Sequence, residues 1–208
     1  MTAPGRSLRA AAITAAALFF ATLAGARGGA AAVPPAGPDC LECAHHEAPA
    51  ALTATIVIPT AGLDGTRLIV EGTVYRPDGR TPAAGVLVYA YHTNPAGIYP
   101  HPQGATGMER WHGSLRGWLV TGRDGRYRIE TVRPGSYPGG AIPAHIHMHV
   151  MPPGGAERSI DDIVFEDDPR VDATYRLRAR DIGGSGIVHL TTDTAGVLGA
   201  TRDIVLPE

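Results

Sequence analysis

The sequence predicts an all-β protein, an antiparallel β-sandwich with long active-site loops. Short segments rich in β-branched residues alternate apolar and polar side chains or run apolar throughout, as in 67–77 and 85–93. Glycine and proline are abundant, at 27 and 18 of 208 residues, and they separate these segments at turn-like intervals. After residue 26, no stretch of ten or more residues shows a convincing helical period.

The strand-like segments follow one another along the chain. We expect strands or strand-like pieces in 53–59, 67–77, 85–93, 144–153, 159–169, 174–180, 186–193 and 201–207. Residues 118–132 read as a hairpin that turns at Arg123-Asp124-Gly125. Two irregular segments interrupt this series, 94–114 and 133–143, and loops as long as the first are usually functional in a compact domain.

The N-terminus reads as a signal peptide covering residues 1–26. Arg6 and Arg9 precede an alanine-rich apolar run, and Ala24-Gly25-Ala26 supplies the small residues of a cleavage site. An uncleaved anchor is the alternative, but the apolar run is short for a bilayer span. We therefore expect an exported protein (secreted, periplasmic or at the cell surface) without stable membrane insertion after cleavage.

The remaining chain suits one domain of residues 51–208, preceded by a low-complexity linker of residues 27–50. A formal net charge of −2 gives no reason to expect nucleic acid as a partner. The linker contains Cys40 and Cys43, the only cysteines. They suit a local disulfide or a plain tail, a surface metal site with His45 and His46, or a redox pair.

The strongest chemical signal is the segment Pro-Ala-His-Ile-His-Met-His. Alternation along a strand would point His145, His147 and His149 to one face. Imidazole is the commonest protein metal ligand, and two such ligands at i and i+2 on a rigid strand can share one ion. The plain alternative is a row of polar residues on a solvated sheet face.

Two tyrosines strengthen the metal interpretation. Tyr99 and Tyr137 each lie in a Gly/Pro-rich loop and are followed by proline, where a core tyrosine is not demanded. Ionising a phenol at neutral pH costs roughly 4 kcal/mol, and a hard trivalent cation removes that obstacle. Two phenolates with two imidazoles therefore suit Fe(III). Taken singly, each tyrosine could equally pack or cap its loop.

These segments in this order resemble the intradiol ring-cleavage dioxygenases, above all the core of protocatechuate 3,4-dioxygenase chains. The resemblance runs over residues 66–169, from NPAGIY through GRDGRYRIETVRPGSYP to PAHIH and FEDDP. It implies a β-sandwich and a mononuclear Fe(3+) site. The ligands it implies are Tyr99, Tyr137, His145 and His147.

The resemblance also implies the reaction. A small aromatic diol would bind the iron through both oxygens, Tyr137 would be displaced, and the displaced base would take a substrate proton. With O2, the ring would open between the two hydroxyl-bearing carbons to a cis,cis-muconate-type diacid. The sequence leaves the particular catechol derivative open. It also leaves the oligomeric state open, a homo-oligomer included.

One position departs from the family pattern. Many members place arginine three residues before the first histidine, where this chain has Ile142. That arginine is thought to steady negative charge on the substrate. We expect Arg133, beside the Pro134-Gly135 turn, to serve as a catalytic substitute. The acidic run 161–168 is expected to be mostly a solvated edge.

Two other functions fit parts of the sequence. Prealbumin-like surface or binding modules use a similar hairpin and Pro-Gly-x-Tyr turn without catalysis, but they require neither Tyr99 nor the histidine row. A cupin-like or zinc hydrolase site at His145, His147 and His149 would leave both tyrosines unexplained. The enzyme interpretation accounts for all of these residues.

Overall fold

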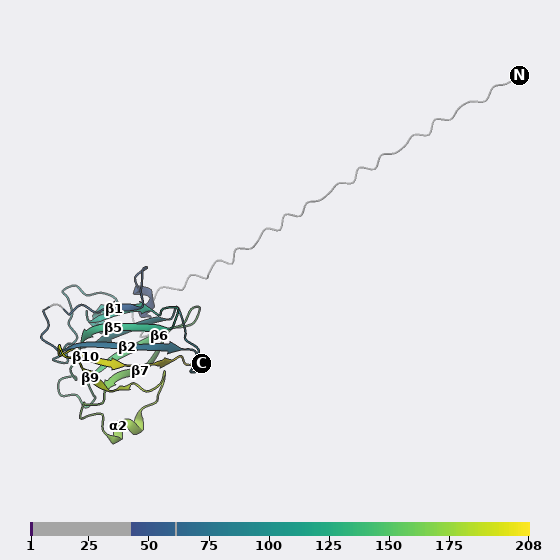
Figure 1. The fold of residues 1–208 in the computed structure, drawn as a ribbon. Coiled ribbons are helices and arrows are strands. Elements are labelled where there is room, and N and C mark those ends of the chain that lie inside the picture. The colour runs from purple at the N-terminus through teal and green to yellow at the C-terminus, as the bar shows by residue number, and fades with distance from the viewer. Residues whose placement is uncertain (2–42, 61) are drawn as a thin grey trace. The chain divides into compact units, whose positions relative to one another are not determined.

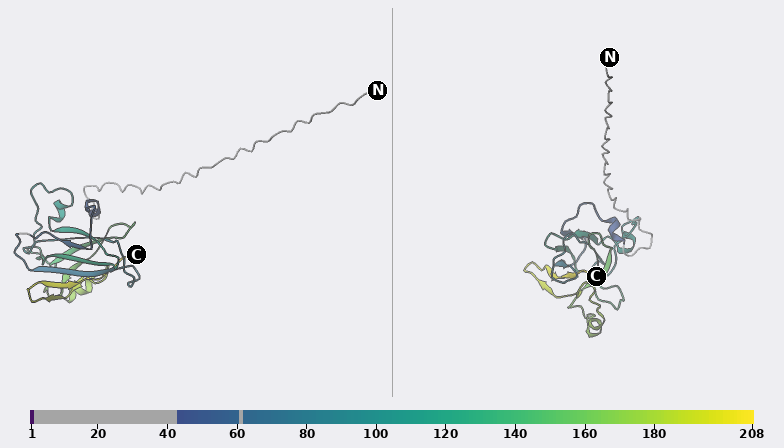
Figure 2. Two further views of the ribbon diagram at one scale, coloured as in Figure 1. Left: turned by 45° about the horizontal axis from the view of Figure 1, so that its top comes forward. Right: turned by 90° about the vertical axis from the view of Figure 1, so that its right-hand side faces the viewer.

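The computed structural model describes residue 1, residues 43–60 and residues 62–208; the residues from 43 onward belong to one compact unit. They form two β-sheets that lie one behind the other (Figure 1), as two further views also show (Figure 2). The expected signal peptide, most of the linker and Cys40 lie outside the described residues.

The first sheet has six strands in the spatial order β1-β5-β2-β10-β9, with β11 beside the end of β2. Its strands are β1 Thr55–Val57, β2 Arg67–Tyr75, β5 Arg126–Val132, β9 Leu190–Thr192, β10 Leu198–Thr201 and β11 Ile204–Val205. β2 pairs antiparallel with β5, and β9 pairs antiparallel with β10. β1 is parallel to β5, and both β10 and β11 are parallel to β2.

The second sheet has five strands in the order β4-β3-β6-β7-β8. Its strands are β3 Leu87–His92, β4 Arg116–Val120, β6 His145–Met151, β7 Arg158–Phe165 and β8 Ile187–Val188. All of its pairings are antiparallel except β7 with β8. The predicted two-layer β fold is confirmed, while four pairings among the described strands are parallel.

The main core lies between the sheets. Leu68 and Ile129 contribute from the first sheet and Val88, Ile146 and Met148 from the second, all fully buried. Each such side chain contributes roughly 1.5–3 kcal/mol through removal of apolar surface from water. Because side chains alternate along a strand, the residues between these core positions in β3 and β6 face the other side of the second sheet.

The expected hairpin at 118–132 is wrong. β4 pairs with β3 and β5 pairs with β2, so the chain crosses from one sheet to the other at residues 121–125. Buried Thr121 explains the departure: its hydroxyl donates to the Ala83 carbonyl and accepts from the Val86 amide. These bonds tie the end of β4 to the segment before β3 instead of to β5.

The expected strand at 174–180 is also wrong. Ala173–Arg178 forms the short helix α2, which projects beyond the sheets (Figure 1). Asp172 caps it by accepting a hydrogen bond from the Tyr175 amide, which favours helix over strand. A second short helix, α1 Glu109–His112, lies within the long loop after β3.

Part of the expected linker belongs to the folded domain. Ala44–Glu47 forms a 3-10 turn, η1, against β3. The Trp118 indole donates to the Ala44 carbonyl at 2.9 Å, and the Glu47 carboxylate accepts from the Met108 amide and the Arg116 guanidinium. Across the described residues, no helix is long and apolar enough to cross a membrane.

Candidate metal centre

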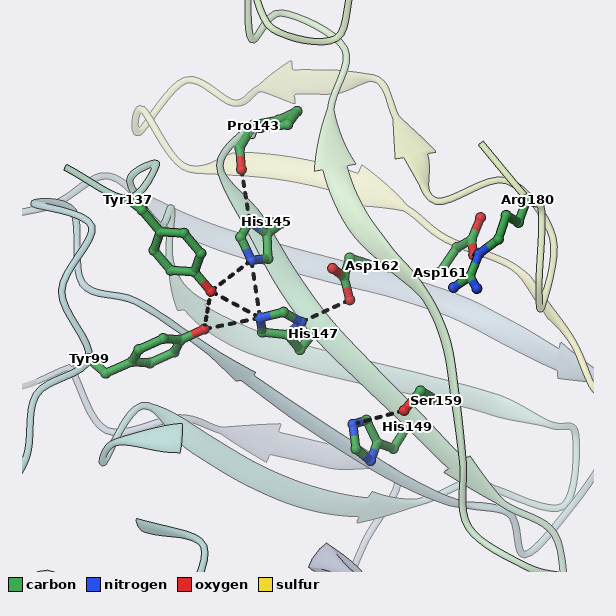
Figure 3. A network of polar contacts seen from close by, with 10 residues as sticks. All are labelled: Tyr99, Tyr137, Pro143, His145, His147, His149, Ser159, Asp161, Asp162 and Arg180. Carbon is green, nitrogen blue, oxygen red and sulfur yellow. Dashed lines mark hydrogen bonds and ion pairs between the residues drawn. The ribbon is translucent and has the colours of Figure 1, made fainter. Parts of the chain in front are cut away.

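The three histidines of β6 point away from the main core, as their spacing predicts. Ile146, Met148 and Val150 belong to the core cluster, so His145, His147 and His149 face the outer side of the second sheet. The loops that follow β3 and β5 bring Tyr99 and Tyr137 to the N-terminal end of this row. Figure 3 shows the three histidines along one face of β6, with Tyr99 and Tyr137 opposite the first two.

Four polar atoms converge at that end. The hydroxyl oxygens of Tyr99 and Tyr137 are 2.6 Å apart, and His147 Nε2 lies 3.0 Å and 3.3 Å from them. His145 Nε2 lies 3.2 Å from the Tyr137 oxygen and 3.1 Å from His147 Nε2. Ligands about 2 Å from a shared metal ion lie about 3 Å from one another, so this spacing suits a single ion.

The two tyrosine loops are held together by close backbone contacts. The Gly135 amide donates to the Asn94 carbonyl, and the Thr93 hydroxyl donates to the Gly135 carbonyl. A Cβ on Gly135 would lie 2.2 Å from the Pro95 carbonyl oxygen. A Cβ on Gly97 would lie 1.9 Å from the Ser136 carbonyl oxygen. Only glycine permits this approach, which brings Tyr99 beside Tyr137.

His145 is oriented by the chain that precedes β6. Its Nδ1 lies 2.7 Å from the Pro143 carbonyl oxygen, so Nδ1 carries the proton and Nε2 presents its lone pair. Buried Asp168 accepts from the Ala144 amide at 2.9 Å and from the Ser136 hydroxyl at 3.4 Å. Asp168 thereby joins the Tyr137 loop to the start of β6. Burial raises the pKa of Asp168, but hydrogen bonds from the Ala144 and Arg170 amides and from Ser136, together with the charge of Arg170, more than offset it and lower the pKa.

His147 is held on two further sides. Its Nδ1 lies 3.0 Å from Asp162 Oδ1, on the neighbouring strand β7. Its ring stacks on Tyr91 at 4.4 Å between centroids, and Tyr91 stacks in turn on His112 at 3.7 Å. These contacts fix both the plane of the imidazole and the direction of Nε2.

Without a cation, the surroundings of Tyr99 and His145 favour the neutral forms of both side chains. Burial, the hydrogen bond with Tyr137 and the repulsion between the two phenolates raise the pKa of Tyr99. Burial and the nearby His147 lower the pKa of His145, which keeps its imidazole neutral. Neutral imidazoles are ready to bind a metal, and two adjacent phenols can both ionise only beside a strong positive charge. The donor set therefore fits a hard trivalent cation such as Fe(III).

Comparisons with known proteins match this architecture. The model of the family described as "Dioxygenase" matches residues 41–183, more than half of the chain. The chain belongs to the intradiol dioxygenase family. The protocatechuate 3,4-dioxygenase beta chain of Burkholderia cepacia is 32% identical over 153 residues, covering 68% of this chain and 65% of that one.

Further similarities extend the family assignment. Catechol 1,2-dioxygenase 1 of Acinetobacter lwoffii is 34% identical over 135 residues, covering 55% of this chain and 42% of that one. The chain thus spans 42% to 65% of the length of these two curated relatives. The structure of chlorocatechol 1,2-dioxygenase from Pseudomonas putida matches with a TM-score of 0.59 at 27% identity, over 83% of this chain and 70% of that one. Family membership disfavours the non-catalytic prealbumin-like alternative.

Among the residues of this intradiol dioxygenase chain, Arg133 is placed differently from expectation. Its guanidinium forms a bidentate ion pair with Asp167 at 2.7 and 2.8 Å and lies over the Phe165 ring. The structure does not bring it to the four converging atoms. Ile142, at the usual arginine position, is exposed.

His149 takes no part in the convergence. Its Nδ1 lies 2.7 Å from buried Glu157, which also accepts from His45 Nδ1 and from the Ala44 and His45 amides. Cys43, the residue directly before the turn η1, is disulfide-bonded. The far end of the histidine row therefore anchors the N-terminal turn η1. A zinc site built on all three histidines is not supported by this placement.

Sequence reasoning missed three contributors, Asp162, Asp168 and Tyr91. The sequence predicts a solvated edge for the two aspartates, because an acidic run alone does not reveal which carboxylates turn inward. Alternation could have placed Asp162 beside the histidine row, had the pairing of β6 with β7 been known. Tyr91 carries a similar signal, since it alternates with core residues of β3.

Proposed function

We propose that this chain is a non-haem Fe(III) intradiol dioxygenase that cleaves a catechol-type ring with O2 to a cis,cis-muconate-type diacid. The observation that supports this proposal is the convergence of two phenol oxygens and two imidazole nitrogens, which make five contacts of 2.6–3.3 Å. The family generally uses non-haem iron, and its curated members here are named for catechol and protocatechuate cleavage.

Each residue has a distinct task in this proposal. His145 and His147 would hold the ion through Nε2 on the rigid strand β6. Tyr99 and Tyr137 would hold it from two loops that are both partly exposed. As the resemblance to the family implies, the Tyr137 oxygen would be the one that leaves the ion and accepts a proton from a substrate hydroxyl. When bound, the ferric ion would supply Lewis acidity, a template for the two diol oxygens and partial electron acceptance.

The partners in this proposal are a small aromatic diol and O2. The reaction adds both oxygen atoms of O2 to the diol and breaks the bond between the two hydroxyl-bearing carbons. The Ile142 side chain stands where many relatives carry an arginine. We therefore expect that no fixed positive charge at position 142 stabilises the negative charge of the substrate.

Colour and oxygen uptake test the proposal together. Protein refolded or expressed with iron should be red-brown, because tyrosinate-to-Fe(III) charge transfer absorbs visible light. The band should shift when catechol is added, and O2 should be consumed in a 1:1 ratio with catechol. Tyr99→Phe should lose the band and the activity. A colourless protein that binds zinc in preference to iron would contradict the proposal.

We also propose that the protein is exported. The support is the signal-like segment of residues 1–26 together with the disulfide at Cys43, since disulfides persist in oxidising compartments. Full-length expression should yield an extracytoplasmic protein whose N-terminus follows Ala26, as intact-mass measurement would reveal. Retention of residues 1–26 in the cytoplasmic fraction would contradict it.

A further inference from the structure

The two histidines of the candidate metal centre are held by different acceptors. His145 Nδ1 faces a neutral backbone carbonyl, that of Pro143, at 2.7 Å. His147 Nδ1 faces a carboxylate oxygen, Asp162 Oδ1, at 3.0 Å. Figure 3 shows Asp162 on the side of the His147 ring opposite the two tyrosines. Only one of the two ligands therefore receives support from a charged side chain.

The chemistry of imidazole gives this contact a consequence. An imidazole that presents its Nε2 lone pair to a metal must keep its proton on Nδ1. A carboxylate that accepts this proton fixes the tautomer, limits rotation of the ring and makes Nε2 a stronger donor. We propose that Asp162 is a positioning residue that orients His147 and strengthens it as an iron ligand. This inference rests on the proposed iron site.

Asp162 could alternatively be a ligand itself. One ligand atom each from His145, His147 and Asp162 lie within 4.8 Å of one another, as a two-histidine, one-carboxylate site requires. The orientation of His147 argues against this. Its Nε2 is directed at His145, Tyr99 and Tyr137, whereas Asp162 contacts Nδ1, and one imidazole cannot direct both nitrogens to the same ion.

The surroundings of Asp162 allow a clean test. Its side chain is 36% exposed and borders a cavity of about 290 Å³ whose wall includes Tyr175 and Ile187. A substitution there removes no core packing. Asp161 borders the same cavity, but its carboxylate lies 4.0 Å from the Arg180 guanidinium and apart from His147 (Figure 3). Asp161→Asn is therefore a matched control.

The experiment compares Fe(III) affinity and colour among Asp162→Ala, Asp162→Asn, Asp161→Asn and the unaltered protein. Competition with a chelator measures affinity, and the tyrosinate-to-Fe(III) band reports the electronic state of the ion. Asp162→Ala should weaken Fe(III) binding by about 10–100-fold, the usual effect of removing a partner of a ligating histidine. Its band should move to lower energy, because a weaker imidazole donor leaves the ion a better acceptor of tyrosinate charge.

The other variants make the result decisive. Asp162→Asn keeps the shape and one acceptor oxygen, so it should fold and show a smaller change in the same direction. Asp161→Asn should match the unaltered protein. Unchanged affinity and colour in both Asp162 variants would overturn the inference, as would an equal loss in Asp161→Asn. Failure of the unaltered protein itself to bind iron would overturn the proposed function as well.

Discussion

The two ends of β6 use the same side chain on the same face for different purposes. At the N-terminal end, His145 and His147 direct Nε2 lone pairs toward two phenol oxygens. At the C-terminal end, His149 Nδ1 meets buried Glu157, which accepts four hydrogen bonds from His149, His45 and the Ala44 and His45 amides. In the proposed function a cation completes the first set of atoms, whereas the second set already has its hydrogen-bond partners.

The difference teaches how a metal site is told from a structural histidine. Spacing alone places all three imidazoles on one face, because strands alternate. The three imidazoles differ in their hydrogen-bonding partners, which show whether each ring faces other lone pairs or a hydrogen-bond acceptor. Converging lone pairs predict an ion, and a buried carboxylate facing an N–H predicts a structural anchor. The predictions below test that distinction.

The largest effect should come from substituting a proposed iron ligand at the N-terminal end of β6. His147→Gln should lower Fe(III) affinity and turnover by more than about 100-fold, exceeding the loss seen when only a ligand's partner is removed. His149→Gln should keep one iron per chain, because His149 lies outside the converging set. Iron content and O2 uptake of the two folded variants measure this. Equal iron loss in both would show that the two ends are one site.

A large effect is also expected where the tyrosine loops meet. Gly135→Ala places a methyl group 2.2 Å from the Pro95 carbonyl oxygen, so the loops that carry Tyr99 and Tyr137 must separate. A displacement of about 1 Å at a reacting centre can cost on the order of 100-fold in turnover. Gly117→Ala is the control, since its Cβ meets the side chains of Ile56 and Ile58 at ordinary distances of 3.4 and 3.7 Å. Normal turnover in Gly135→Ala would refute the close-approach argument.

At the C-terminal end of β6, substitutions are expected to lower the free energy of unfolding. Glu157→Ala leaves four donors without their acceptor in a buried position and should lower the free energy of unfolding by on the order of 3 kcal/mol. Glu130→Ala, which removes two more exposed ion pairs, should cost about 1 kcal/mol or less. Urea unfolding measures both. Iron bound per folded chain should stay constant, and its loss in Glu157→Ala would mean that η1 supports the metal centre.

The same anchor should respond to acid. Burial raises the pKa of Glu157, but hydrogen bonds from His149 and His45 more than offset it and lower the pKa below its usual 4.5. The stability that this carboxylate contributes is therefore present above about pH 4.5 and is lost as pH falls through its lowered pKa. Glu157→Gln should flatten this acidic part of the stability curve relative to the unaltered protein. An unchanged curve would contradict the shift.

Much of the fold could be predicted because it depends on local patterns. The alternation in β2 and β6 and the apolar run of β3 identified strands and the face of each histidine. The crossing at 121–125 could not be predicted, since the hydroxyl of Thr121 finds its partners in a distant segment. Helix α2 depends on one capping aspartate, Asp172, a weak signal in a chain otherwise read as strand.

The candidate site also contains residues that the sequence could predict and residues that it could not. Tyr99, Tyr137, His145 and His147 were each picked out by residue type and loop chemistry, and the resemblance joined them. Asp162 and Asp168 could not be singled out from an acidic run, because their function depends on which strand lies beside β6. Pairings between strands far apart in sequence carry that information, and no local pattern encodes it.

A buried histidine outside this row extends the comparison to pH. His92 lies on the core side of β3 and is bound only by neutral groups, the Thr93 carbonyl and the Thr131 hydroxyl. Burial lowers the pKa of His92 to about 4. The stability from its neutral form is thus complete above about pH 6.5 and is lost as pH falls toward 4, by on the order of 3 kcal/mol. His92→Gln should remove that part of the slope in urea midpoints measured from pH 7.5 to 5.

The smallest effect is expected at Arg133. Its side chain is 28% exposed and its charge is already paired with Asp167, so it is poorly placed to steady charge on a substrate. Arg133→Ala should lower kcat by no more than about fivefold, which corresponds to the roughly 1 kcal/mol at most that a partly exposed ion pair is worth. Asp167→Asn, which breaks the same pair from the other side, should change kcat equally. A large kcat loss in Arg133→Ala alone, with KM unchanged, would show that the arginine leaves Asp167 during turnover and acts on the substrate as the sequence predicted.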